Sequence, residues 1–512
     1  MLVKTFGSSI QGINAITITV EVNIDIGVQF MMVGLPDSAV KESHQRIEAA
    51  LRNNNYKIPN KKITINMAPA DIRKEGSAYD LTLAIGLLAA SELIKADKVG
   101  DYIIMGELSL DGGLQPIKGA LPIAIEARKQ GFKGFILPMQ NAREAAIVTD
   151  LEVYGAENIK QVIDFFEETG KLERVTVNTR EEFYSQLNHY EHDFADVKGQ
   201  ENIKRALEVA AAGGHNVILI GPPGSGKTML AKRLPSILPP LNLYEALETT
   251  KIHSVAGKMS KEASLISVRP FRSPHHTISD VALVGGGSNP QPGEISLAHN
   301  GVLFLDELPE FKRTVLEVLR QPLEDRVITI SRARFTVEYP SSFMLVAAMN
   351  PCPCGFYNHP DRDCVCPAGG VQKYLNKISG PLLDRIDIHV EVVPVPFREL
   401  TEIKSSTPSS IIRERVEKAR YLQEQRFKDQ KNIFCNAQIS SKMLRSICEI
   451  DSAGMALMKT AMEKLSLSAR AYDRILKVAR TIADLDNSAR IKIEHLAEAI
   501  QYRSLDRETW GG

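Results

Sequence analysis

A glycine-rich loop holds the residues of this chain that are best suited to chemistry. Its members, which have the spacing of a Walker A phosphate-binding loop, are Gly221, Pro222, Pro223, Gly224, Ser225, Gly226, Lys227 and Thr228. Glycines let backbone N–H groups approach phosphate oxygens, Lys227 reaches the β- and γ-phosphates, and the Thr228 hydroxyl is placed to hold Mg²⁺. The apolar run 216–220 precedes the loop and a possible helix start, 229–233, follows it. The pattern predicts a site for ATP, or another nucleoside triphosphate, with Mg²⁺.

Two adjacent acids follow a second apolar run, 301–305, as in a Walker B strand. Asp306 would coordinate Mg²⁺, and Glu307 would orient or deprotonate the attacking water. An acidic pair at the end of a surface strand is the alternative. A complete phosphate loop in the same chain favours the Walker B interpretation.

Other polar side chains could complete a hydrolysis site. Asn350 ends the apolar run 343–349 and can position the lytic water, as sensor 1 does in AAA+ ATPases. Arg385 could stabilise transition-state charge on a neighbouring subunit's γ-phosphate, or form a surface salt bridge with Asp384 or Asp387. Arg470 begins a predicted helix and suits a sensor 2 arginine, with Arg474 one turn later as the competing candidate.

Two inserted segments bear on the substrate. In 326–338, two β-type runs flank a short turn, which predicts a hairpin with Arg332 and Arg334 at or near its tip. Such arginines would contact DNA phosphates without reading sequence, although a solvent-exposed hairpin is the alternative. The segment 269–289 contains a glycine run and predicts a second loop, in which His275 and His276 contact phosphate or are ordinary polar residues.

Four of the six cysteines lie within fifteen residues, at Cys352, Cys354, Cys364 and Cys366. Four thiolates on a short loop can form a closed, structural Zn²⁺ site, with His359 as a possible substitute ligand. Four reduced thiols are the alternative. This clustering differs from the spread of a secreted disulfide framework.

The elements that position these residues divide the chain into several units. A length of 512 residues is too great for one core. Strand-like and helix-like stretches alternate over 1–171, a polar linker covers 172–193, the nucleotide module covers 194–400, and a helical lid covers 401–512. The apolar run 81–94 predicts a buried helix rather than a membrane span, because it is short and contains Glu92.

Composition limits the possible partners and location. Lys plus Arg and Asp plus Glu both number 62, so nucleic-acid binding needs a local basic patch rather than overall charge. The chain starts without a signal-type apolar segment and has no apolar run long enough for a membrane span. We therefore expect a cytoplasmic protein with no membrane partner.

Several motifs together resemble one family. The segments 197–200, 292–307, 347–355 and 381–387, with the Walker A loop, are similar to those of Mg-chelatase-like AAA+ ATPases of the YifB/ComM type. The resemblance implies an α/β fold, namely an AAA+ P-loop core with a C-terminal helical lid. It also implies a homohexameric ring in which Arg385 acts in trans. For ComM-like members it implies DNA binding and ATP-driven branch migration during recombination of incoming DNA in natural transformation.

The first 171 residues resemble the Lon protease domain, whose α/β fold is like that of ribosomal protein S5 domain 2. The similar segments are 74–80 and 106–117. Lon needs a serine activated by a lysine. Aligning the motifs places Ala78 at the nucleophile and Ile123 at the lysine, while Ser77 and Lys118 lie nearby out of register. These departures predict a domain without protease activity, and a one-residue slip would restore Ser77.

Three functions follow as hypotheses. The first is a hexameric ATPase that translocates on single-stranded, duplex or branched DNA, as a helicase or branch-migration motor. The second is an ATP-dependent Lon-like protease. The third is a chelatase-type remodelling ATPase, against which the sequence contains no recognisable integrin-like metal-binding domain.

Overall fold

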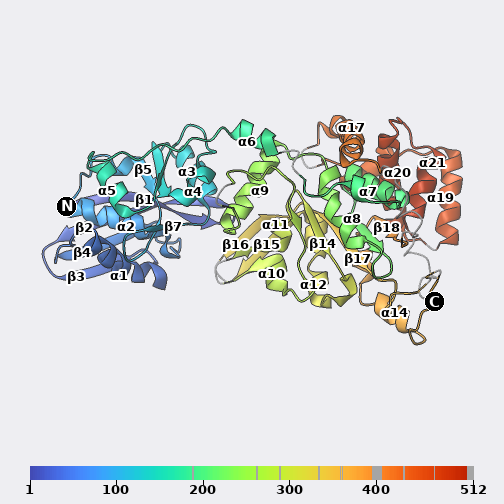
Figure 1. Ribbon diagram of the computed structural model, residues 1–512, viewed down its shortest axis with the longest axis horizontal. Coiled ribbons are helices and arrows are strands. Elements are labelled where there is room, and N and C mark those ends of the chain that lie inside the picture. Colours follow the sequence, from blue (N-terminus) through green and yellow to red (C-terminus); the bar gives the residue numbers. More distant parts are fainter. Residues whose placement is uncertain are drawn as a thin grey trace.

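The chain is elongated in the computed structural model, with an N-terminal α/β domain at one end and a helical lid at the other (Figure 1). The structure describes residues 1–186, 190–260, 263–287, 290–332, 335–357, 359, 361–394, 406–430, 433–465 and 467–503. Within these residues, none of the helices combines the length and apolar character needed to cross a bilayer.

The N-terminal domain is built on a seven-stranded mixed sheet in the order β3-β4-β2-β1-β5-β8-β9. Its strands are β1 Leu2–Gln11, β2 Asn14–Asp25, β3 Gln29–Val33, β4 Lys62–Ala68, β5 Tyr102–Ile104, β8 Gly134–Pro138 and β9 Glu152–Ala156, with a small ladder of β6 Glu107–Leu108 and β7 Leu114–Gln115. Its helices are α1 Ser38–Asn53, α2 Asp80–Ala90, α3 Ala120–Lys129, α4 Met139–Ala145 and α5 Ile159–Phe166. Every residue of α2 is buried, which confirms the buried helix predicted for this run.

The polar segment 172–193 is not extended throughout. It contains helix α6, Thr179–Gln186, and the Phe183 side chain is buried in the core of the N-terminal domain. The Glu182 carboxylate also accepts hydrogen bonds from Arg143 and Ser264. Part of this segment is therefore packed against both neighbouring units.

The nucleotide module contains a five-stranded parallel sheet in the order β11-β14-β17-β10-β18. Its strands are β10 Val217–Ile220, β11 Phe271–Arg272, β14 Val302–Leu305, β17 Met344–Met349 and β18 Ile388–Glu391. The helices are α7 Glu201–Gly213, α8 Lys227–Arg233, α9 Leu243–Val255, α10 Asp280–Val284, α11 Glu294–Leu297, α12 Arg313–Glu317, α13 Arg320–Asp325, α14 Gly370–Leu375 and α15 Gly380–Leu383. β10, β14 and β17 are buried at every position, as expected for central parallel strands.

Two short antiparallel ladders project from this module. One is β12 Gly285–Gly286 with β13 Gln291–Pro292, and the other is β15 Val327–Arg332 with β16 Phe335–Pro340. β15 and β16 pair antiparallel from Val327 with Pro340 to Arg332 with Phe335. The hairpin predicted from the sequence is confirmed.

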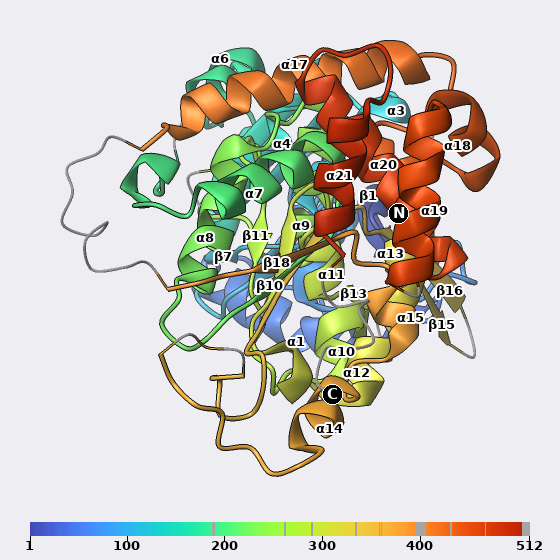
Figure 2. The same cartoon turned by 90° about the vertical axis from the view of Figure 1, so that its right-hand side faces the viewer.

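The lid is helical and packs on the nucleotide module (Figure 2). Its helices are α17 Ser409–Phe427, α18 Ser441–Ile447, α19 Ser452–Lys464, α20 Ala469–Leu485 and α21 Ile493–Gln501. α17 and α20 both contact α7 beside the parallel sheet, and one buried cluster joins them. The lid and the sheet therefore share a core.

Candidate nucleotide-hydrolysis site

The phosphate loop follows β10 and leads into α8, as the sequence predicted. Gly224 and Gly226 have φ values of 78° and 89°, in the left-handed region that glycine adopts readily. Gly226 is the residue before the first turn of α8, so the loop runs directly into the N-terminus of this helix. Backbone N–H groups at a helix N-terminus can bind an anion. This geometry suits phosphate oxygens.

The Lys227 ammonium group is held inside the loop. Its Nζ donates to the carbonyl oxygens of Gly221 at 2.7 Å and Pro222 at 2.9 Å, and to Asn350 Oδ1 at 3.2 Å. Burial lowers the pKa of Lys227, and the carboxylates of Asp306 and Glu307 act in the opposite direction. The predicted sensor 1 residue Asn350 therefore contacts the predicted phosphate-binding lysine directly.

The two predicted Mg²⁺ ligands also meet. Thr228 Oγ1, on α8, donates to Asp306 Oδ2, at the end of β14, over 2.7 Å. A hydroxyl and a carboxylate oxygen in contact are the hard oxygen donors that Mg²⁺ prefers. The residues therefore fit Mg²⁺: Thr228 and Asp306 would hold the ion, which would supply positive charge to stabilise a bound triphosphate.

The Glu307 side chain is exposed and paired with a histidine from a distant segment. Its backbone has a φ of 53°, and His276 Nδ1 lies 3.2 Å from Glu307 Oε2. The His276 ring also packs against His275, with ring centroids 4.1 Å apart. The loop that contains His276 thus contacts the predicted water-activating carboxylate.

Arg385 lies at the opposite end of the sheet from the phosphate loop. Its backbone carbonyl accepts a hydrogen bond of 2.9 Å from Asn216 Nδ2, and Asn216 comes just before β10, whereas Gly221 comes just after it. At about 3.3 Å per residue, this strand separates the two positions by about 17 Å. Figure 2 accordingly places α8 and α15 on different sides of the module. Arg385 is thus remote from the phosphate loop of its own chain.

The two lid arginines lie at the Arg385 end as well. Arg470 Nη1 is 2.8 Å from Asp384 Oδ2, and Arg474 Nη1 is 3.0 Å from Asp387 Oδ1. These acids flank Arg385 in the chain. α20 is therefore linked by ion pairs to the Arg385 segment.

A buried network surrounds Asp387. His215 Nδ1 lies 3.0 Å from Asp387 Oδ2, and His215 Nε2 lies 2.8 Å from Thr481 Oγ1 on α20. Burial lowers the pKa of His215, which outweighs the opposing effect of Asp387. Although burial alone would raise the pKa of Asp387, Arg474 and His215 hold it well below its usual range.

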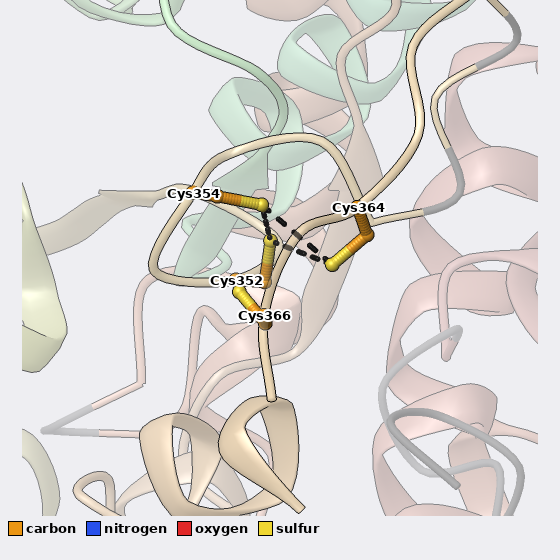
Figure 3. Close-up of side chains that lie close together, drawn as sticks. All are labelled: Cys352, Cys354, Cys364 and Cys366. Atoms are coloured by element: carbon orange, nitrogen blue, oxygen red, sulfur yellow. Dashed lines mark hydrogen bonds between the residues drawn. The ribbon is translucent and has the colours of Figure 1, made fainter. Parts of the chain in front are cut away.

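The four clustered cysteines converge in one loop after β17 (Figure 3). Their Sγ atoms all lie within 4.8 Å of one another, with distances of 3.2 Å from Cys352 to Cys354, 3.8 Å from Cys352 to Cys364, and 3.6 Å from Cys354 to Cys364. Tetrahedral Zn²⁺ with Zn–S bonds of about 2.3 Å would require sulfur separations of about 3.8 Å. The donor set therefore fits a closed, structural Zn²⁺ site. His359 Nδ1 instead accepts the backbone N–H of Asp361 at 3.1 Å.

This cysteine loop also packs on the phosphate loop. Gly355 has a φ of 86°, and a Cβ built there would lie 2.6 Å from the Cδ atom of Pro223. Cys352 is fully buried and follows Asn350 by two residues. A metal held by the cysteines would therefore stabilise the backbone beside both Asn350 and the phosphate loop.

The predicted DNA-contacting arginines lie at the margin of the described structure. Arg332 is the last residue of β15, but its side chain is outside the described part, and Arg334 lies wholly outside the described residues. The body of the hairpin is packed: Ile328, Ile330 and Val337 are buried. The hairpin is therefore anchored in the nucleotide module.

The Lon-like serine and lysine have separate partners. Ser77 Oγ donates to a carboxylate oxygen of Glu107. The side chain of Lys118 instead lies against Gly257, after α9. Ile123, which the motif alignment places at the lysine position of Lon, is buried in α3. This arrangement does not assemble a Ser–Lys pair among the described residues around Ser77.

Three contacts of this region had no signal in the sequence: His276 with Glu307, Asp384 with Arg470, and Asp387 with Arg474. Each joins segments that are remote in the chain. The sequence had suggested a pairing of Arg385 with Asp384 or Asp387, whereas both acids pair with α20 and Arg385 pairs with Glu324. Only the fold could reveal these partners.

Family models match three stretches of the chain. The model for magnesium chelatase subunit ChlI matches residues 193–400, that for subunit ChlI of Mg-chelatase matches 20–141, and that for the ChlI C-terminal region matches 406–503. The matches cover parts of the N-terminal domain, the nucleotide module and the lid.

Curated relatives match nearly the full length. The YifB protein of Escherichia coli (strain K12) is 46% identical over 498 residues, which cover 97% of this chain and 96% of that protein. The competence protein ComM of Haemophilus influenzae is 43% identical over 510 residues, or 99% and 98% of the two chains. Lon protease 2 of Bacillus subtilis is 31% identical over a shorter stretch, 28% of this chain and 27% of the protease.

Proposed function

This chain belongs to the Mg-chelatase-like family that includes YifB and ComM, and we propose that it is an ATP-driven motor that works on DNA as a homohexameric ring. The process would be competence-related DNA recombination, because a protein of 43% identity over almost its whole length is a competence protein. ATP and Mg²⁺ are the expected cofactors, and Zn²⁺ at the four cysteines would have a structural role.

The observation that carries the proposal is the division of the hydrolytic groups between two ends of one sheet. Lys227, Asn350 and Glu307 lie near the phosphate loop, but Arg385 lies about 17 Å away at the other end of β10. An arginine in that position supports action on the ATP of a neighbouring copy. The site would then be complete only between two subunits, which favours a ring.

The chain's own residues suggest how hydrolysis proceeds. The Lys227 ammonium group donates three hydrogen bonds to uncharged oxygen atoms. A bound γ-phosphate would replace these with stronger hydrogen bonds between oppositely charged groups. Asn350 and Glu307 would then orient the water, and Arg385 of the next subunit would stabilise the developing charge. Glu307 must leave His276 to do so, since the two are paired in this structure.

DNA is the proposed track because of the hairpin. The chain has no net charge, so contact with phosphates requires local basic residues such as Arg332 and Arg334. Their position between the Walker B acids and Asn350 is where related rings place a pore hairpin. Contacts of this kind would weaken with salt and would be independent of sequence.

The decisive test is the rate of ATP hydrolysis with no DNA, single strands, duplex and a branched junction. We expect stimulation by at least one DNA form, reduced at high salt. The R332A/R334A double variant should lose stimulation but keep its basal rate. The R332A and R334A single variants should each reduce stimulation, and R313A, which removes one exposed arginine from α12, serves as the charge-matched control for each of them. A rate that is the same under all four conditions would refute the proposal that DNA is the track.

A further inference from the structure

In the isolated subunit the Arg385 guanidinium is mostly buried and is bound to groups of its own chain. Its Nη2 group donates to a carboxylate oxygen of Glu324, its Nη1 group donates to the carbonyl of Pro381 at 2.5 Å, and the side chain is only 11% exposed. The Nε atom is buried and has no hydrogen-bond partner among the described residues. Because one of its buried donors has no acceptor, this guanidinium does not make all its possible hydrogen bonds here, as expected if it adopts a second position during the reaction.

Glu324 stands at the base of the predicted DNA-contacting hairpin. It is the penultimate residue of α13, and β15 begins three residues later at Val327. The intervening Arg326 has a φ of 56° and accepts the backbone N–H of Ser341, just after β16, at 2.8 Å. Both strands of the hairpin are therefore tied to the end of α13, one by a single connecting residue and the other by this hydrogen bond.

An open groove connects the segments involved. Its lining includes Val284 of α10, Glu324 of α13, Ile328 and Thr329 of β15, and Arg385. α10 belongs to the second inserted segment, 269–289, and Figure 2 shows α10, α12, α13 and α15 on the same side of the module. Both inserted segments and the trans-acting arginine thus meet at one place.

We propose that Glu324 is a positioning residue that holds Arg385 back until the hairpin moves, so that substrate in the pore controls hydrolysis in the neighbouring subunit. This inference rests on the proposed function for the identity of the substrate. The restraint itself requires only that Arg385 acts in trans.

The restraint predicts a modest effect. Glu324 is 58% exposed, so its pairing with Arg385 is screened by solvent. Exposed ion pairs contribute little, and the low exposure of Arg385 favours the upper part of their range, which corresponds to about two- to five-fold in an equilibrium. Neutralising Glu324 should therefore raise the rate without DNA by about two- to five-fold.

Mixed rings isolate the effect. Donor subunits with E307Q supply Arg385 but do not hydrolyse ATP, and acceptor subunits with R385A hydrolyse ATP only with an arginine from a neighbour. Donors with E307Q/E324Q should raise the ATPase rate of the mixture about two- to five-fold over donors with E307Q alone, without DNA. E324Q placed in the acceptor should change nothing, because its partner arginine is absent there.

Glu317 provides a matched control. It lines the same groove, but its carboxylate pairs with Arg320 at 2.9 Å rather than with Arg385. The proposal is overturned if E307Q/E317Q donors give the same rise as E307Q/E324Q donors, if neither gives a rise, or if no donor activates R385A acceptors. Light scattering and melting curves of each variant would verify assembly and folding.

The two proposals fail in different ways. If DNA does not alter the rate of any ring, the DNA motor is refuted, yet a higher rate from E324Q donors would still support the restraint. If DNA stimulates wild-type rings but E307Q/E324Q donors give the same rate as E307Q donors, the restraint is refuted and the DNA motor is not. When both proposals hold, DNA should reduce the difference in ATPase rate between mixtures made with E307Q donors and those made with E307Q/E324Q donors.

Discussion

Replacing Asp387 with asparagine should destabilise the nucleotide module much more than the same change at Asp384. Both acids flank Arg385 and both pair with an arginine of α20, but their surroundings differ. Asp387 is 2% exposed and its partner Arg474 is 24% exposed, whereas the values for Asp384 and Arg470 are 29% and 71%. The two substitutions therefore compare a buried and an exposed ion pair on the same two elements.

The magnitude for Asp387 follows from its burial. Asparagine can still accept the hydrogen bond from His215, so the change removes the charge and leaves the shape. Breaking a buried pair costs about 3–5 kcal/mol, and since Arg474 can turn toward solvent we expect about 2–3 kcal/mol. At the 2–4 °C per kcal/mol typical of units of 150–250 residues, the melting temperature should fall by about 4–12 °C.

The exposed pair sets the comparison. Asp384→Asn should cost no more than about 1 kcal/mol. Differential scanning calorimetry of both variants and the parent would measure the shifts under one set of conditions. If Asp384→Asn lowers the melting temperature as much as Asp387→Asn does, the assignment of Asp387 as the ionic link between β18 and α20 is wrong.

Three further predictions follow from the same site. Burial lowers the pKa of His215, so the stability that its neutral ring contributes is complete above the ordinary histidine pKa and is lost as the pH falls below it. His215→Asn should flatten the decline of melting temperature as the pH is lowered from about 6.5, and an unchanged slope would contradict this. Elemental analysis of the purified protein should find one Zn²⁺ per chain, and none in C364S. The C448S variant, which changes a buried cysteine outside the cluster, should retain the metal. A metal-free wild-type protein with four reactive thiols would refute the site. Removing the contact between His276 and Glu307 with His276→Ala should raise ATP hydrolysis without DNA by about two- to five-fold, and His275→Ala should not; equal effects would show that the pairing does not restrain Glu307.

Sequence reasoning predicted the positions of residues that lie directly after the strand that places them. The Walker A loop, Asp306 and Asn350 each follow an apolar run directly, and parallel strands bring their carboxyl ends to one edge of a sheet. Neighbouring ends then place the side chains in contact, as Thr228 with Asp306 and Lys227 with Asn350 show. Such contacts follow from the order of residues and the geometry of a parallel sheet.

The remaining contacts depend on how distant segments fold back. A histidine in a glycine-containing loop gives no sign of reaching Glu307, and the lid helix could not be oriented from its periodicity alone. The polar composition of 172–193 predicted a linker but not the helix within it, Thr179–Gln186, whose Phe183 is buried in the core of the N-terminal domain. Tertiary burial decided these cases, which local composition does not encode.

The packing of the N-terminal domain argues for a brace rather than a swinging module. Leu241, Ala246 and Leu265 of the nucleotide module are buried in the same cluster as the core of that domain. Burial raises the pKa of Glu144, which lies at this contact. Its carboxyl group accepts a hydrogen bond from Ser254 on α9 of the nucleotide module and another from the Leu121 backbone N–H of its own domain. A hinge would have to expose this shared apolar surface and separate this carboxyl from its partners.

The same domain touches the hairpin. A Cβ at Gly12, in the turn between β1 and β2, would lie 3.1 Å from Val337 of β16, and Ile13 packs against the cluster that contains Ile328 and Ile330. The hairpin therefore lies between the N-terminal domain and the rest of the nucleotide module. If the chain is the proposed motor, a domain that packs on α9 and on the hairpin would limit how that hairpin moves and would direct its movement toward α13 and Glu324. Such a mechanical role for the N-terminal domain would require neither a serine nucleophile nor a lysine at position 123.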